Sequence, residues 1–541
     1  MVDTTRSNNI PSGWDRRTFL KAGGLTVGGL SLASLIAACG GGAAGGGSGG
    51  QTGTLHMPFI NDMQIPDPDI MYEGEGALVT HLVYEGLCQY KPGTPEIIGN
   101  LAKSWTISPD QLVYTFSLQP GVKFHDGTPA DAASWVKSFE RRTKVNQGPA
   151  YMVAGVAKAE APDATTFVVT LKQPNNAFLS YMACPWQPFA VSPDAVAKNA
   201  VGDDAAQEWL KTHDAGTGPF VMSEFVPGSH YTFTAAPDYW RGKPGFDTIR
   251  IDITSDIATQ KLQLDSGAFD MVTKGFPVPD VLAYQKNPQF TVTNSVGGVG
   301  DGLLLNPNSG IFGTNKALRV AMRTALDRVS IVDTAWGGLV KAQTAMWSEG
   351  SLPLAMDPFP TTVDTGPLKA MVAALPSKKV DLAVITDGGA ARAQMGELIQ
   401  TQLAALGLDV TVRAMPPSEQ FDLVNQPAEK RPDMMLSFVG GDAFHLDTSF
   451  RIMFRTGAAP LNYYQYSNPE LDKLMDDALL KPTPAEMNAV YAQMCQLLLD
   501  DGIMIPMCLP PTSAIAHTAV TGYEVNSFFP QVVDYHAAKK S

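Results

Sequence analysis

Residues 380–414 read VDLAVITDGGAARAQMGELIQTQLAALGLDVTVRA. The apolar run at 380–386 predicts a short buried strand that ends at the glycines 388–389. Residues 390–406 favour a helix, and residues 408–414 favour a second strand. A strand, a helix and a strand in series predict two parallel strands joined by a crossover helix, so this part of the chain is expected to contain an α/β sheet.

Two further apolar segments are expected to join this sheet. Leu303, Leu304 and Leu305 form one short strand, and residues 434–439, MMLSFV, form another that runs into Gly440-Gly441-Asp442. In open α/β sheets, ligands bind beyond the carboxyl ends of the strands. The turn at 440–442 is therefore predicted to border a cleft.

The first half of the chain shows other patterns. Residues 55–65 predict a strand, 77–87 a helix, 113–118 a half-buried strand, and 122–124 a short strand after the Pro120-Gly121 turn. Residues 130–142 favour a helix with Asp131 near its positive end. His125 and Asp126 suggest an acid/base pair, but a histidine before Asp-Gly-Thr more often belongs to a turn.

Several motifs occur in one order along the chain. They are VYEGL at 83–87, LAKSW at 101–105, YTFSLQPGVKFHDGTP at 114–129, GTGPF at 216–220, PDYWRGKPGFDTIRI at 237–251, LDSGAFD at 264–270, LRVAMRTALDR at 318–328 and YSNPELDKLMDDAL at 466–479. The series resembles the peptide/nickel-binding family of solute-binding proteins that serve ABC importers. The resemblance implies an α/β, two-lobed periplasmic-binding-protein fold of the peptide-binding type, with a hinge. It implies a first lobe at 54–300 and 510–541, with a sub-domain at about 88–200, and a second lobe at 301–509.

The resemblance also implies a function. The protein would capture dipeptides or oligopeptides outside the cytoplasm and deliver them to the permease subunits of an ABC transporter, as a monomer and without chemistry or a cofactor of its own. One alternative is the same fold binding another solute, such as a nickel chelate, a sugar oligomer or an opine-like compound. A more remote alternative is a secreted, lipid-anchored hydrolase, for which the chain offers no nucleophile motif in a structured context.

In this family an aspartate after the second-lobe strand receives the α-amino group of the peptide, and Asp442 occupies that position here. Its neighbours Phe438, Val439, Gly440 and Gly441 are then expected at the ligand. The family usually has an aromatic residue three positions before the aspartate, where this chain has Val439, so side-chain preference stays open. Asp442 as a turn residue that bonds its own backbone is the alternative, and Asp447 is a competing choice.

Other candidate ligand contacts are aromatic and basic. Trp347, Tyr463 and Tyr464 are candidate cleft aromatics. Arg451, Arg455 and His445 are candidates for a ligand carboxylate, because arginine binds carboxylates in a bidentate manner. Spacing does not select among these three, and most recognition of varied peptides is expected from backbone groups.

The N-terminus predicts export. Arg16 and Arg17 precede the uncharged residues 22–38, which end in Ile36-Ala37-Ala38 before Cys39. This arrangement resembles a twin-arginine signal that ends in a lipobox, so residues 1–38 are expected to be removed and Cys39 to carry the lipid anchor. A membrane-spanning helix is the alternative, but the apolar stretch is shorter than the roughly 20 residues a span needs. Residues 39–53 are rich in glycine and predict a flexible tether.

Composition narrows the possible partners. The net charge is −14, which disfavours binding to nucleic acid or to anionic lipids, so the lipid anchor is expected to be the only link to the membrane. Cys88, Cys184, Cys495 and Cys508 are scattered and suggest at most one disulfide. The chain has no C-x-x-C or H-E-x-x-H motif, so no metal site is expected.

Overall fold

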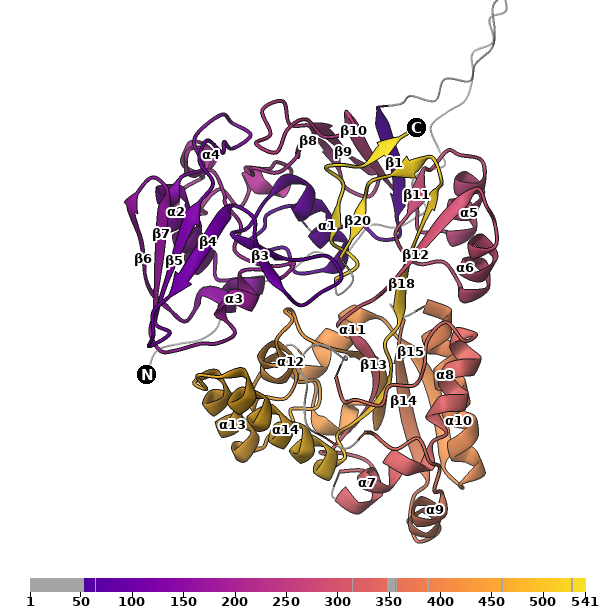
Figure 1. Cartoon of the computed structure of the whole chain (residues 1–541). Coiled ribbons are helices and arrows are strands. Elements are labelled where there is room, and N and C mark those ends of the chain that lie inside the picture. The colour runs from indigo at the N-terminus through magenta and orange to yellow at the C-terminus, as the bar shows by residue number, and fades with distance from the viewer. Residues whose placement is uncertain are drawn as a thin grey trace, which may run out of the picture. The chain divides into compact units, whose positions relative to one another are not determined.

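The computed structural model describes residues 53–541 except Gln64, Thr314, 348–355, Asp357, 387–388, 459–460 and 527–528. The predicted signal at 1–38, Cys39 and nearly all of the predicted tether therefore lie outside the described residues, as do the Asp387-Gly388 pair and part of the loop after Trp347. Residues 51–541 form one compact unit. Figure 1 shows their helices and strands.

The second lobe is built on a five-stranded sheet in the order β15-β14-β16-β13-β17. The strands are β15 (Asp409–Met415), β14 (Lys379–Ile385), β16 (Met434–Val439), β13 (Gly300–Leu305) and β17 (Met504–Cys508). β14 pairs in parallel with both β15 and β16, whereas β13 is antiparallel to β16 and β17. This confirms the predicted α/β sheet, with an antiparallel pair added at one side.

Helices pack against this sheet and close its core. They are α7 (Lys316–Ala325), α8 (Arg328–Trp336), α9 (Gly366–Ala373), α10 (Gly389–Ala405), α11 (Pro417–Asp422), α12 (Leu446–Met453), α13 (Pro469–Leu479) and α14 (Pro484–Asp501). The short 3₁₀ turns η4 (Leu423–Asn425) and η5 (Ala428–Lys430) lie between α11 and β16. α10 crosses from β14 to β15 and packs on both strands beside α8 (Figure 1). One hydrophobic cluster runs from Leu303 to Cys508.

The first lobe contains three larger sheets. The first has the order β1-β10-β9-β8, with β1 (Thr54–Phe59), β10 (Thr248–Ile253), β9 (His230–Ala235) and β8 (Phe220–Val226). The second has the order β11-β18-β12, with β11 (Met271–Val272), β18 (Pro511–His517) and β12 (Phe290–Val296). The third is antiparallel, β4-β5-β7-β6, with β4 (Ala102–Ile107), β5 (Val113–Leu118), β7 (Thr166–Leu171) and β6 (Val156–Asp163).

Helices and short strand pairs complete this lobe. The helices are α1 (Gly74–Val83), α2 (Ala132–Val145), α3 (Phe178–Tyr181), α4 (Pro193–Asn199), α5 (Ile257–Asp265) and α6 (Val278–Gln285), with the 3₁₀ turns η1 (Gly148–Val153) and η2 (Trp209–Lys211). The strand pairs are β2 (Cys88–Tyr90) with β3 (Ile97–Gly99), β19 (Val520–Thr521) with β22 (Lys539–Lys540), and β20 (Glu524–Val525) with β21 (Val533–Asp534). As predicted, Asp131 caps α2, where its carboxylate accepts the Ser134 N–H at 3.0 Å.

The chain passes twice between the sheets of the two lobes. β12 is followed by residues 297–299 and then β13, and β17 is followed by residues 509–510 and then β18. The two passages lie side by side, because Val296 pairs with Pro511 and Asp301 pairs with Cys508. Short paired passages of this kind are where a hinge absorbs rotation of one lobe against the other.

Some predicted elements in the first half were wrong. The strand predicted at 55–65 ends at Phe59, and the helix predicted at 77–87 ends at Val83, because Tyr84 is already extended. Residues 122–124 join no named strand and form only a single bridge between Lys123 and Pro129. His125 pairs with Asp214 at 2.5 Å rather than with Asp126, whose carboxylate accepts the Thr128 N–H within the turn.

Four cysteines lie within the described residues. Cys88, Cys184, Cys495 and Cys508 are free and buried. Within the described ranges, no three His, Cys, Asp or Glu side chains are grouped to hold a metal ion. Of the helices that the structure describes, none combines the length and the apolar character that crossing a membrane requires.

Candidate functional site

The turn at 440–442 follows the carboxyl end of β16 and approaches two other segments closely. A side chain on Gly440 would place its Cβ 2.9 Å from the Cα of Val299, in the passage between the lobes. A Cβ on Gly441 would lie 2.6 Å from the Ser449 nitrogen on α12. Backbone packing therefore requires both glycines, and it holds Asp442 between the interlobe passage and the start of α12.

Asp442 is a buried carboxylate whose partners come from the first lobe. The Tyr72 hydroxyl and the Tyr151 hydroxyl, the latter at 2.6 Å, both donate to Oδ2. Burial raises the pKa of Asp442, and the two hydroxyls lower it in part. In the described part of the chain, no backbone N–H donates to this carboxylate and no donor reaches Oδ1. This geometry does not match the alternative of a turn aspartate bonded to its own backbone.

The two tyrosines are held by an aromatic cluster of the first lobe. Tyr72 packs edge-to-face on Trp186 with ring centroids 5.4 Å apart, and Tyr151 packs in the same manner on Tyr181 at 5.9 Å. Burial raises the pKa of both Tyr72 and Tyr151 well above the usual value, and the charge of Asp442 raises it further. Both phenols therefore stay protonated and serve Asp442 as neutral donors.

The segment after Asp442 inserts into the first lobe. Ala443 and Phe444 belong to a hydrophobic cluster otherwise built mainly from residues 87–190. The Phe444 N–H donates to the Tyr90 hydroxyl at 2.9 Å, and the rings of Tyr90 and Phe529 pack 5.9 Å apart. The two lobes thus meet directly at this segment.

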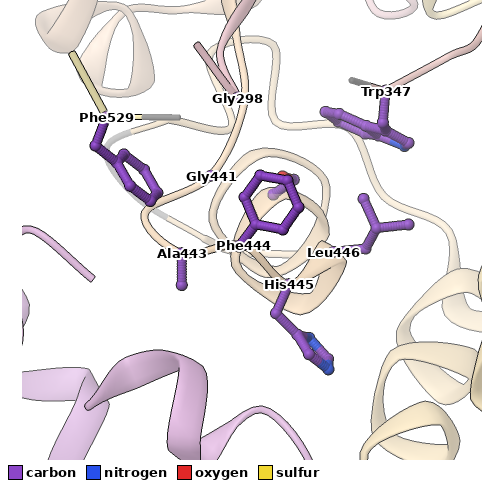
Figure 2. Close-up of a pocket in the computed structure, with 9 residues that line it drawn as sticks. Gly298, Trp347, Gly441, Ala443, Phe444, His445, Leu446 and Phe529 are labelled. Carbon is purple, nitrogen blue, oxygen red and sulfur yellow. The ribbon is translucent and has the colours of Figure 1, made fainter. Parts of the chain in front are cut away.

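A small pocket lies beside this contact. Its lining residues are Gly298, Trp347, Gly441, Ala443, Phe444, His445, Leu446, Ser449 and Phe529. Figure 2 shows the Phe444 ring between Phe529 and Trp347, with the His445 ring turned away from them. The free space is about that of one water molecule. A neighbouring pocket of similar size is lined by Trp347, Val439 and Asp301, among others.

The predicted carboxylate contacts already have partners. Arg451 on α12 binds Asp447 through Nε and Nη2, at 3.0 and 2.8 Å, and Asp447 also accepts the Tyr181 hydroxyl at 2.7 Å. Arg455 binds both oxygens of Asp476, at 2.7 and 3.0 Å. The structure therefore places Asp447 in an ion pair with Arg451.

His445 forms the N-terminal cap of α12. Its Nδ1 accepts the Asp447 N–H at 3.2 Å, so the neutral ring carries its proton on Nε2. Burial lowers the pKa of His445 to about 4, and the ring packs edge-to-face against Tyr491 with centroids 5.7 Å apart. His445 is thus an uncharged residue near neutral pH.

The other predicted contacts are divided between two regions. Val439 and Trp347 line the small pockets, and Phe438, half-buried, pairs in register with Asp301. Tyr464 lies instead near the amino end of β16. Its carbonyl accepts the Asn308 amide at 2.6 Å, and Asp433 raises the pKa of its phenol in addition to the effect of burial. Tyr463 is buried in the second-lobe core.

Three motifs of the first lobe converge on one buried carboxylate, Glu85 of VYEGL. It accepts the Tyr239 hydroxyl at 2.9 Å and the Trp240 indole N–H at 3.0 Å, both from PDYW, and the Thr217 hydroxyl at 3.0 Å, from GTGPF. Burial raises the pKa of Glu85 to about 7. These motifs therefore stabilise the first lobe, and Tyr239 and Trp240 pack as structural residues.

The comparison with family models matches residues 96–460 to the bacterial extracellular solute-binding proteins, family 5, middle region. The chain belongs to this family. Within the family, the protein "Probable D,D-dipeptide-binding periplasmic protein DdpA" of Escherichia coli K12 is 27% identical to this solute-binding protein, over 88% of this chain and 93% of the relative.

Solved structures confirm the two-lobed fold. One is the periplasmic binding protein DppA of Helicobacter pylori in complex with the peptide STSA, with a TM-score of 0.77 and 22% identity, covering 90% of this chain and 98% of that one. Another is AgaA of A. tumefaciens R10 in complex with agropinic acid, with a TM-score of 0.75 and 23% identity, covering 90% and 99%. The same fold thus holds ligands of different chemistry.

Two residues at the candidate site had no signal in the sequence. Tyr72 follows an acidic, proline-rich turn, and Tyr151 lies in the 3₁₀ turn η1. They reach Asp442 across 370 and 291 positions of the chain. A single sequence gives no pattern for contacts of that separation.

Proposed function

We propose that this solute-binding protein captures dipeptides or oligopeptides and holds their α-amino group at Asp442. The supporting observation is that Asp442 is buried where the lobes meet, and that among the described residues its hydrogen-bond donors are two neutral hydroxyls, both on Oδ2. A buried carboxylate without a cation is stabilised by a ligand that brings one. Phe438, Val439, Gly440, Gly441 and Trp347 surround the ligand in this proposal.

Capture requires the two lobes to separate. The small pockets beside Asp442 hold no more than about one water molecule each, so a peptide enters only if the lobes open. We propose that the paired passages at 297–299 and 509–510 are the hinge, and that the lobes divide there, as 54–300 with 510–541 and 301–509. Closure around a ligand is a known mode of domain motion.

In this proposal, the export signal and Cys39 near the N-terminus determine where the protein is located. The twin-arginine signal exports the chain, Cys39 receives the lipid, and the glycine-rich residues that follow tether a monomer to the outer face of the cell membrane. The closed protein then presents its ligand to the permease of an ABC transporter and catalyses no reaction. The ligand-bound relative with agropinic acid keeps a second candidate open, in which the same fold binds a non-peptide solute.

Native mass spectrometry of the purified protein tests the substrate class. After gentle desorption and then denaturation, released masses that resolve into short peptides support the proposal. A single mass that is not a peptide supports the second candidate. In that case the fold and the transport role remain, and Asp442 binds a different cationic group.

A further inference from the structure

We propose that the protein recognises only the cationic end of its peptide and does not neutralise a ligand carboxylate, so that its substrates include peptides with an uncharged C-terminus. This inference rests on the proposed function and extends it to the substrate class. The observation behind it is that the arginines and lysines described below, which lie in the part of the chain that the structure describes, already have partners.

Arg451, on α12, is the arginine or lysine closest to Asp442 along the chain. It forms an ion pair with Asp447. Asp447 is almost fully buried, with 1% of its side chain exposed. If Arg451 turned away to bind a ligand carboxylate, the carboxylate of Asp447 would remain buried without its cation, which is strongly destabilising. Nε donates to Oδ2 of Asp447 and Nη2 to Oδ1, and Nη1 lies 3.4 Å from Asp476, so both edges of the guanidinium already face carboxylates of the protein.

The basic residues of the first lobe near Tyr72 are engaged in the same way. Arg142 donates to Asp69 at 2.8 Å and to the carbonyl of Trp186, the residue that packs on Tyr72. Arg141 donates to both Asp67 and Asp69, and the Lys274 ammonium lies 2.6 Å from Glu75. These pairs balance charge within the first lobe.

The second small pocket also contains an ion pair. Asp301, which lines it, binds Arg392 of α10 at 2.6 Å. Arg328 donates to three main-chain carbonyls, and His445 is neutral because burial lowers its pKa to about 4. The internal positions outside the described residues, including 348–355, SEGSLPLA, contain no lysine or arginine in the sequence.

Arg455 needs a direct test, because its ion pair is more exposed than that of Arg451. Its partner Asp476 is half exposed, and an exposed ion pair exchanges partners at little cost. Arg455→Gln is therefore the decisive variant. It lies on the surface and leaves the partners of Asp442 and Asp447 unchanged.

The experiment uses a mixture of tetrapeptides in three forms: free, C-terminally amidated and N-acetylated. Competition between the forms is measured by native mass spectrometry on the wild-type protein and on Arg455→Gln. We expect the amides to bind within about threefold of the free peptides, the acetylated peptides to lose at least fiftyfold, and Arg455→Gln to change neither ratio. The expected ratios distinguish a modification that removes an ion pair with the protein, here acetylation, from one that removes none, here amidation.

Each other outcome has one meaning. A loss of affinity of thirtyfold or more on amidation overturns the inference but leaves peptide binding at Asp442 intact. If Arg455→Gln selectively loses binding of the free-acid peptides, Arg455 is the contact for the ligand carboxylate, and the inference is overturned as well. Equal binding of acetylated and free peptides contradicts the role of Asp442. Binding of none of the three forms overturns the inference and excludes tetrapeptides from the substrates of the proposed function.

Discussion

The Tyr151 hydroxyl of the first lobe lies 2.6 Å from Oδ2 of Asp442 in the second lobe. Tyr72 donates to the same oxygen, so two neutral phenols bridge the lobes at a single carboxylate. The bridge satisfies one oxygen of Asp442 and leaves the other without a described donor. The closed arrangement and the proposed ammonium site therefore share one residue.

Peptide affinity should decrease in acid as Asp442 becomes protonated. Burial raises the pKa of Asp442 above 3.8, and the groups that face it are Tyr72 and Tyr151, with the Cys184 thiol nearby. Below the folded pKa the neutral acid no longer attracts an ammonium. Because the hydroxyl of Tyr151 lowers that pKa, Tyr151→Phe should move the acid limb of the affinity profile to higher pH.

Calorimetric titration of a bound peptide between pH 4 and pH 7 measures this shift. Tyr284→Phe is the matched control, since its hydroxyl donates to Asp265 at 2.6 Å elsewhere in the first lobe, and it should leave the profile unchanged. An identical acid limb in wild type and Tyr151→Phe would contradict the proposed coupling.

Glu85 should make the stability of the protein depend on pH. The pKa of Glu85 is about 7 in the folded protein, compared with 4.5 for an unperturbed glutamate, the value expected in the unfolded chain. The folded state therefore binds the proton more tightly, and the free energy of unfolding decreases as pH rises from about 4.5 to 7. The full effect corresponds to about 3 kcal/mol. Relative to wild type, Glu85→Gln should gain up to that amount between pH 4.5 and pH 8.

Urea unfolding at the two pH values gives the comparison. The exposed Glu140→Gln is the control and should follow wild type at both. A difference between wild type and Glu85→Gln that does not change with pH would show that Glu85 is ionised in the folded state throughout this range.

Loss of Arg451 should destabilise the protein. Arg451→Met leaves the buried carboxylate of Asp447 with the Tyr181 hydroxyl as its one donor among the described side chains, and breaking such a pair lowers the free energy of unfolding by about 3 kcal/mol. Lys473→Met breaks an exposed pair of the same i,i+4 spacing with Asp477 and should change it by less than about 0.5 kcal/mol. Equal effects of the two variants in urea unfolding would contradict the structural role of Arg451.

Cys39 should determine where the protein resides. Cys39→Ala removes the thiol that accepts the lipid, so the protein should move from the membrane fraction to the soluble fraction. Ser48→Ala, in the same glycine-rich segment, is the control and should stay with the membrane. Retention of Cys39→Ala in washed membranes would contradict the lipobox interpretation.

The second-lobe sheet could be predicted because its strands are buried apolar runs. Residues 434–439 form β16 with the predicted bounds, and β14, α10 and β15 each differ from prediction by one residue at each end. Residues 122–124 also looked like a strand, yet they join no sheet. Local alternation cannot reveal whether a neighbouring strand is available for pairing.

Only the second-lobe part of the candidate site could be predicted from the sequence. The turn after β16 identified Asp442, because the carboxyl end of a buried strand is a local feature. Its partners Tyr72 and Tyr151, the engagement of Arg451 by Asp447, and the position of Tyr464 near the other end of β16 depend on tertiary packing. The sequence supplied suitable residue types but not their pairing.

The most direct test of ammonium binding at Asp442 is calorimetric titration of Asp442→Asn with a peptide that binds the wild-type protein. Asparagine keeps an oxygen for the hydroxyls of Tyr72 and Tyr151, so the fold and the lobe contact should persist. Loss of the charge should weaken binding of a free amino terminus at least a hundredfold, with little change in thermal stability. Equal affinity in wild type and Asp442→Asn would contradict the account.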